Sequence, residues 1–260
     1  MTTKIQLTRV GFITILLTAI AIVCIFSFSK KASKPMKATD PAKGFAVVEL
    51  FTSEGCSSCP AADEVVTKLS AAYIENVFVL GFHVDYYNRL GWKDEFSKSI
   101  YSDRQRNYAE TFKLDEMYTP QVIVNGKKEL VGSDAAKLKN LVAAELQNDV
   151  NASIRLTAAT GTSQVKVAWQ IEKTGNSTLH VALVQVQTQT NVRKGENEGR
   201  QLKHINIVRD FLSIDAQQQN GTASLSLPAG IGFDECKVIA CLQQNKTAVI
   251  TGSASTSISQ

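Results

Sequence analysis

Two cysteines, three positions apart, lie in the stretch Glu49-Leu50-Phe51-Thr52-Ser53-Glu54-Gly55-Cys56-Ser57-Ser58-Cys59-Pro60. Before them, residues 45–51 form a short and nearly continuous apolar run, which is typical of a strand covered on both faces. After them, residues 61–73 carry apolar side chains at helical spacing, namely Val65, Val66, Leu69 and Ala72. The pair is therefore predicted at a turn from a strand into a helix.

This position favours thiol chemistry. A helix N-terminus supplies unpaired N–H groups and partial positive charge, which stabilise a thiolate and can lower a cysteine pKa from ~8.5 into the range ~3.5 to 7.5. Cys56, in the turn, is the expected nucleophile. With Ser57 or Ser58 capping the helix, Pro60 falls in the first turn, where its missing N–H costs nothing. Cys59, one turn away, is placed to resolve a mixed disulfide.

Two other uses of a C-x-x-C pair compete with this interpretation. A structural zinc site usually needs a second pair, and only Cys236 and Cys241 remain, far downstream and spaced by four residues. A purely structural disulfide is the other use. Closing so short a loop constrains the unfolded chain little, because the entropic gain grows with loop length. Stability alone is therefore a poor reason for a bridge here.

A proline leads into a further apolar strand in Tyr118-Thr119-Pro120-Gln121-Val122-Ile123-Val124-Asn125-Gly126, which ends in an Asn-Gly turn signal. The order C-x-x-C, second strand, Thr-Pro, strand, Asn-Gly turn, strand and helix resembles the thioredoxin superfamily. That resemblance implies a cis proline at Pro120, packed against the cysteines. It also implies that Thr119 offers backbone groups to an extended substrate.

Within that superfamily the chain resembles the secreted bacterial family known as domain of unknown function 1223. The matching stretches are residues 49–60, 83–87, 90–94, 104–105, 118–121, 124–126, 131–134, 199–200 and 204–209. Together they cover most of residues 45 to 254. The resemblance implies a fold and a site, but little about the substrate.

The expected fold has two parts. Residues 44–148 are predicted as an α/β thioredoxin-like domain, a mixed sheet flanked by helices, with a helical insertion at 88–117. Residues 150–254 are predicted as an antiparallel β-sandwich-like domain, because the apolar period changes there to two. Its strands are expected at 153–157, 164–171, 179–186, 222–227 and 237–243, and residues 255–260 form a tail.

Two segments of this second part carry separate expectations. Residues 191–209 are rich in charge and are predicted as a long loop, which either folds over the neighbouring cleft or presents solvated side chains. Cys236 and Cys241 are expected to be small buried residues that do not bridge each other. Five residues along a strand span ~16 Å, whereas a disulfide tolerates a Cα separation of ~7 Å at most.

Four residues are candidates to assist the cysteines. Glu49 is predicted either as a buried carboxylate that moves protons for Cys59 or as a solvated edge residue. His83, at a strand end, is either a proton acceptor or a histidine satisfied by a backbone carbonyl. Trp92 and Arg104 are expected to contact the substrate or to pair with Glu49 or Asp85.

The N-terminal segment has the character of a membrane-targeting signal. Residues 10–28 carry no charge and follow Lys4 and Arg9, which is typical of a cleaved signal peptide over 1–29 or of an uncleaved membrane anchor. Residues 30–43 form a linker. The folded part is therefore expected to be exported to the periplasm or cell envelope. Of the five cysteines, Cys24 lies in this segment, and the four that remain are too few for a disulfide-built scaffold.

The net charge of +4, over 260 residues with 44% hydrophobic and 20% charged composition, is modest and shows no basic patch. Nucleic acid is therefore not an expected partner. The predicted function is thiol–disulfide exchange with a protein substrate and a separate redox partner, without metal or organic cofactor. It requires Cys56 to be reachable from solvent and Pro120 to be cis beside the sulfurs. The alternatives are a non-enzymatic envelope binding module with a fixed bridge, and a periplasmic metal carrier that uses Cys56, Cys59 and His83.

Overall fold

The computed structural model describes residues 44–172 and 175–259 of the chain, so the predicted leader and linker, residues 1–43, lie outside it. Its helices are α2 (Cys59–Ala72), α3 (Ser99–Phe112) and α4 (Ala135–Glu145), with 3-10 turns at Asn88–Leu90 and Phe233–Glu235. Its strands are β1 (Ala46–Thr52), β2 (Val77–His83), β3 (Gln121–Val124), β4 (Lys128–Val131), β5 (Ser153–Thr160), β6 (Gln164–Glu172), β7 (Ser177–Asn191), β8 (Gln201–Asp215), β9 (Asn220–Ser226), β10 (Cys236–Gln244) and β11 (Ile250–Ser259). Within these described ranges, no helix has the length and apolar character needed to cross a membrane.

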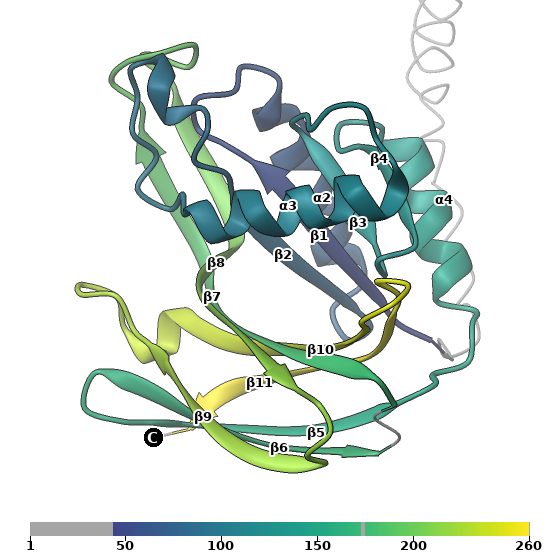
Figure 1. Cartoon of the computed structure of the whole chain (residues 1–260). Helices are drawn as coiled ribbons and strands as arrows, with labels where there is room; N and C mark the ends of the chain where they lie inside the picture. The colour runs from purple at the N-terminus through teal and green to yellow at the C-terminus, as the bar shows by residue number, and fades with distance from the viewer. Residues whose placement is uncertain (1–43, 173–174, 260) are drawn as a thin grey trace, which may run out of the picture. The chain divides into compact units, whose positions relative to one another are not determined.

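The strands form one mixed sheet of 11 strands in the order β4-β3-β1-β2-β8-β7-β10-β11-β5-β6-β9. The expectation of a thioredoxin-like α/β domain followed by a separate sandwich is therefore wrong. The two regions join where β2 pairs with β8 in parallel, with Gly81 opposite Ile207. From there β8 continues as the antiparallel partner of β7, so hydrogen bonding runs without a break through both halves (Figure 1).

Strand β8 is the element that the sequence pattern did not predict. Much of it was expected to belong to a loop over residues 191–209, but only residues 192–200 are a loop, and a 15-residue strand follows. The first six residues of the strand alternate in burial, with Leu202, His204 and Asn206 inside. Two of these three inward side chains are polar, so a search for alternating apolar residues misses the pattern. Their burial depends on partners from distant segments.

Helices cover both faces of the part of the sheet that contains β1 and β2. On one face, Val48 and Leu50 of β1 pack with α2 and α4 in a core that includes Val66 and Leu138. On the other face, Phe51 and Phe82 pack beneath α3, against residues such as Tyr101 and Tyr108. Each such fully buried side chain contributes roughly 1.5–3 kcal/mol to folding.

The part of the sheet without helices curls over so that β5, β6 and β9 enclose a third core with β7 and β10 (Figure 1). Here Val165 and Leu225 meet Leu183 and Val238, all of them buried. The residues expected to form a tail continue β11 as far as Ser259. Cys236 and Cys241 are free and buried, as predicted, on opposite faces of β10.

Candidate functional site

A disulfide joins Cys56 and Cys59, with their Cα atoms 5.4 Å apart. Strand β1 ends at Thr52, the chain turns through a Ser53 O to Cys56 N hydrogen bond of 3.1 Å, and Cys59 is the first residue of α2. Ser58 occupies the N-cap position and Pro60 lies in the first turn, which confirms the predicted helix start. The Ser58 hydroxyl lies 3.4 Å from Cys56 Sγ and donates to it, because a disulfide sulfur has no proton.

Both cysteines are nearly sealed from solvent. Each is 1% exposed, whereas Ser57 and Ser58 between them are exposed. The expectation that Cys56 is reachable from solvent is therefore wrong, so exchange at this pair needs a movement that exposes a sulfur atom. We call residues 53–59 the disulfide turn.

The Thr119–Pro120 peptide bond is cis, as the resemblance implied. Phe51 pairs with Gln121, so the register places buried Pro120 opposite Thr52, the last residue of β1, at the strand end from which the disulfide turn departs. Thr119 is half-buried, and its Oγ1 has no hydrogen-bond partner among the described residues. Its backbone role toward a substrate stays a prediction.

His83, at the carboxyl end of β2, is buried and hydrogen-bonded to a carboxylate. Its Nδ1 lies 2.7 Å from Oδ2 of Asp94, and the same oxygen accepts from the Glu54 backbone N–H at 2.9 Å. Burial alone would raise the pKa of Asp94, but His83 and backbone N–H donors lower it below its usual range. Asp94 is thus a carboxylate, so the His83 Nδ1–H is the donor. His83 therefore supports the disulfide turn from inside and does not line a surface.

Glu54 is the centre of a second buried group. Its Oε2 accepts from the half-buried Trp92 indole at 2.7 Å, and its Oε1 lies 3.5 Å from His204 Nε2. The other nitrogen of His204 lies 3.6 Å from Asp63 Oδ2 on α2. Both His204 distances are those of ion pairs without a hydrogen bond. Burial would lower the pKa of His204, but the two carboxylates outweigh it and raise the pKa to about 10. His204 is thus a buried cation between Glu54 and Asp63.

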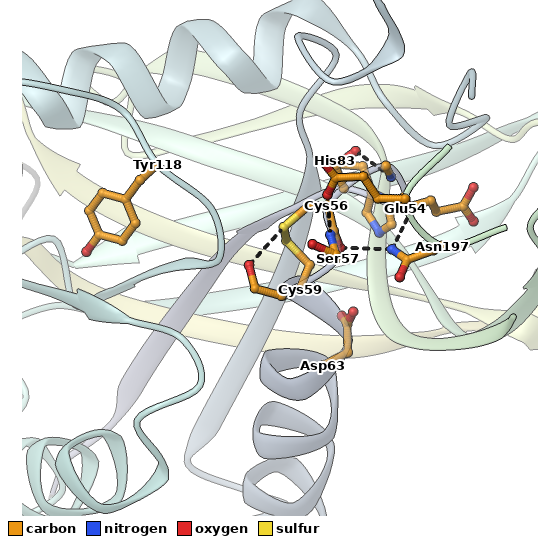
Figure 2. Close-up of a disulfide and its surroundings, with 12 residues drawn as sticks. Glu54, Cys56, Ser57, Cys59, Asp63, His83, Tyr118 and Asn197 are labelled. Atoms are coloured by element: carbon orange, nitrogen blue, oxygen red, sulfur yellow. Dashed lines mark hydrogen bonds between the residues drawn. A yellow bond between two sulfur atoms is a disulfide. The ribbon is translucent and has the colours of Figure 1, made fainter. Parts of the chain in front are cut away.

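The β7–β8 loop, residues 192–200, holds the disulfide turn from outside. Asn197 is fully buried, and its Nδ2 donates to the backbone oxygens of Glu54 at 2.8 Å and Cys56 at 2.9 Å. The backbone N–H of Ser57 donates to Oε2 of Glu196 at 2.9 Å. Figure 2 shows Asn197 beside Ser57 on one side of the disulfide and Tyr118 on the opposite side. Both alternatives for the polar segment hold in part, because residues 192–200 pack against the disulfide turn while their charged side chains are exposed.

Glu49 and Arg104 lie together on the other face of the sheet. Glu49 is buried beside α3, and its Oε1 accepts from Arg104 at 2.5 Å. Arg104 also contacts Tyr108 at 3.2 Å and Gln243 at 3.4 Å. Of the two alternatives for Arg104, the structure has the pairing with Glu49. Glu49 shares its face of β1 with Phe51, whereas Leu50 faces the helix that begins at Cys59. Glu49 therefore lies on the face of the sheet opposite to that helix, and it is buried and not a solvated edge residue.

Sequence reasoning named the disulfide turn but missed most of its partners. None of five partners, Glu54, Asp63, Asp94, Asn197 and His204, has a predicted role of its own, although Glu54, Asp94 and His204 lie in stretches that carry the family resemblance. These five residues share one property, a polar side chain that is buried, since each is at most 8% exposed. Within residues 44–172 and 175–259, no three His, Cys, Asp or Glu side chains are grouped so as to hold a metal ion.

The sequence matches the model of one protein family, described as "Protein of unknown function (DUF1223)", over residues 47–243. No curated protein matches it significantly. A crystal structure of a protein from Agrobacterium tumefaciens is similar at 26% identity and a TM-score of 0.63, covering 84% of this chain and 95% of that one. The fold described above is thus shared with an experimentally determined structure.

Two weaker similarities are to a domain of the outer membrane lipoprotein Omp28 from Porphyromonas gingivalis and to a DUF3823 family protein from Bacteroides ovatus. The first has 13% identity and a TM-score of 0.26, and covers 42% of this chain and 89% of that chain. The second has 14% identity and a TM-score of 0.28, and covers 42% and 54%. Neither supports an argument about this chain.

Proposed function

The chain belongs to the DUF1223 family, and we propose that it carries out thiol–disulfide exchange through the Cys56–Cys59 pair. The observation that carries the proposal is the disulfide at the start of α2, with the Ser58 hydroxyl donating to Cys56 Sγ. A helix N-terminus and a hydroxyl donor both stabilise the thiolate that exchange requires. We propose a likeness to thioredoxin-like proteins only at this turn, and not for the fold of the whole chain.

In the proposed reaction a thiolate of a dithiol substrate attacks Cys56 Sγ. The Cys56–Cys59 bond breaks, and Cys59 leaves as a thiolate that takes a proton from solvent. The second substrate thiolate then attacks the substrate sulfur of the mixed disulfide and releases the Cys56 thiolate. The substrate dithiol is oxidised to a disulfide while the cysteine pair gains two electrons, and the reverse sequence reduces a substrate disulfide. A separate redox partner resets the pair.

The test uses the folded chain in glutathione buffers of graded redox ratio. After acid quenching and alkylation with a maleimide of known mass, mass spectrometry counts the free thiols. We expect a reversible change of two thiols, and we expect Cys59→Ser to trap a mixed disulfide through Cys56. Cys56→Ser is the matched control and should trap none through Cys59. A bridge that stays closed in the native protein at every ratio would contradict the proposal.

A second candidate is a non-enzymatic binding module whose bridge is fixed. The observation that favours it is the 1% exposure of both Cys56 and Cys59. It predicts that the bridge opens only when the protein unfolds, so the urea dependence of thiol release would coincide with loss of secondary structure. The same alkylation experiment therefore separates the two candidates.

Export to the periplasm or cell envelope belongs to the proposal. The uncharged residues 10–28 after Lys4 and Arg9 support it, as does the disulfide, because disulfides persist in oxidising compartments. The proposed partners are a thiol-bearing protein substrate, a redox partner and, where residues 10–28 are retained, the membrane. A reporter active only outside the cytoplasm, fused after residue 43, should be active, and a reporter inactive there would contradict export.

A further inference from the structure

Exchange at this site requires a movement of the disulfide turn. An incoming thiolate has to reach a sulfur atom, yet Cys56 and Cys59 are each 1% exposed. The residues between them, Ser57 and Ser58, are exposed, so the turn itself forms the surface over the bridge. Whatever holds the backbone of this turn in place therefore also opposes attack on the disulfide.

The β7–β8 loop makes three hydrogen bonds to that backbone. Asn197 donates to the carbonyl oxygens of Glu54 and Cys56, and Glu196 accepts from the N–H of Ser57. These contacts bracket Cys56 on both sides along the chain. Two of them are buried, and although the Cys56 carbonyl also accepts from the Cys59 N–H at 3.2 Å, breaking them leaves the buried Glu54 carbonyl without its donor, which is costly.

The side-chain amide of Asn197 is oriented by a hydrogen bond within its own loop. Its Oδ1 accepts from the Arg200 guanidinium at 2.8 Å, which directs Nδ2 toward the two carbonyls. Hydrogen bonds between Val192 and Arg200, and from the Gly199 N–H to Val192, close the base of the loop at 2.9 Å. A side chain fixed in this way acts as a rigid support and not as a mobile surface group.

Two hollows flank the loop. One of about 330 Å³ is lined by Pro60 and Asp63 of α2 together with Arg200, and the other of about 570 Å³ by Tyr86, Tyr87 and Glu196. The loop thus borders a hollow through Arg200 near its end and another through Glu196.

We propose that Asn197 is a positioning residue that holds the disulfide turn in its buried conformation and thereby sets the rate at which Cys56–Cys59 can be attacked, with Glu196 as its second support. The claim that Asn197 controls exchange with a natural substrate rests on the proposed function. The test of the inference does not need such a substrate.

The test measures the rate at which dithiothreitol opens the bridge in the native full chain. One reagent thiolate attacks a cysteine sulfur and the other cysteine leaves as a thiolate. The second reagent thiolate then attacks the reagent sulfur of this mixed disulfide and releases the remaining protein cysteine as a thiolate, which gives the cyclic disulfide of the reagent and two protein thiols. Asn197→Ala removes two buried hydrogen bonds and should react about tenfold faster, whereas Glu196→Ala removes one exposed bond and should react roughly threefold faster.

Asn191→Ala is the matched control, because the side chain of this exposed asparagine in the same hairpin accepts from Gln201 and, among the described residues, makes no hydrogen bond to the disulfide turn, so the variant should react at the wild-type rate. Leu225→Ala is the stability control, since it opens a cavity in the distant third core. If Leu225→Ala accelerates reduction as much as Asn197→Ala at equal loss of melting temperature, the effect is global and the inference is overturned.

The two proposals fail differently. A wild-type bridge that reacts with dithiothreitol, together with an Asn197→Ala bridge that reacts no faster, overturns the positioning role and leaves exchange intact. A wild-type bridge that stays closed in glutathione, together with an Asn197→Ala bridge that opens, supports the positioning role and contradicts the proposed function.

Discussion

Nε2 of His204 lies 3.5 Å from Oε1 of Glu54, so a strand from the C-terminal half supports the residue two positions before Cys56. Asp63 on α2 lies 3.6 Å from the other ring nitrogen. One buried cation thus links β8, the disulfide turn and the helix that begins at Cys59. Because the pKa of His204 is raised to about 10, this link is charged at neutral pH.

The first prediction concerns pH. A histidine whose pKa rises on folding adds stability that is complete below its unfolded pKa of about 6.5 and is lost as the pH rises toward its folded pKa. The free energy of unfolding should therefore fall by roughly 3 kcal/mol between pH 6 and pH 9, since each pKa unit is worth about 1.4 kcal/mol. Urea denaturation across this range measures it, and His204→Gln should flatten the profile. A wild-type profile as flat as that of the variant would count against the ion pairs.

The second prediction concerns the buried pair Glu49–Arg104. Arg104→Met strands a carboxylate that is 0% exposed, so the free energy of unfolding should drop by roughly 3–5 kcal/mol. Adding Glu49→Leu should restore much of that loss, because no charge is then left unpaired. Chemical denaturation checks both variants.

Arg106→Ala is the control for that experiment, since Arg106 lies on the same helix and pairs with Asp103 at the surface. Its stability should equal that of wild type within error. If the Arg104 and Arg106 variants lost equal stability, burial of the pair would not be the cause.

The third prediction concerns Gly126, which has φ of +61° in the β3–β4 turn. A Cβ there would lie 1.9 Å from the carbonyl oxygen of Ala248, in the turn between β10 and β11. Gly126→Ala should therefore reduce the free energy of unfolding by upward of about 3 kcal/mol. Gly230→Ala, at φ of +82° with no atom within 4 Å of the added carbon, should cost only roughly 1 kcal/mol. Equal costs in thermal unfolding would rule out the close approach.

The fourth prediction concerns Ser58 and depends on the proposed function. In a Cys59→Ser background, Ser58→Ala removes the hydroxyl that lies 3.4 Å from Cys56 Sγ, so less of Cys56 should be thiolate at pH 7. Alkylation of Cys56 by iodoacetamide should slow by roughly threefold to tenfold. Ser57→Ala is the control, because Ser57 contacts Glu196 through its backbone N–H. Unchanged alkylation after Ser58→Ala would remove the hydroxyl from the chemistry.

Local signals were predicted well, because neighbouring residues decide them. The helix start at Cys59 follows from the missing N–H of Pro60, which suits proline to the first turn; Ser58 holds the N-cap position without a side-chain hydrogen bond to the helix. The β3–β4 hairpin follows from its Asn-Gly turn. The partners of the disulfide turn were not predictable in this way. His204, Asp63 and Asn197 are polar residues whose burial depends on one another, and a periodicity of apolar residues does not reveal them.

The sequence by itself determined the elements around the cysteine pair and its place between a strand and a helix, since proline chemistry and apolar spacing act over a few residues. Only the tertiary structure decided that the two halves share one sheet, because β8 pairs with β2 through residues 126 positions apart, Gly81 and Ile207. The same pairing brings the β7–β8 loop and His204 to the disulfide turn. Contacts at such separation are set by which buried charges and backbone groups find partners, and that is a property of the whole folded chain.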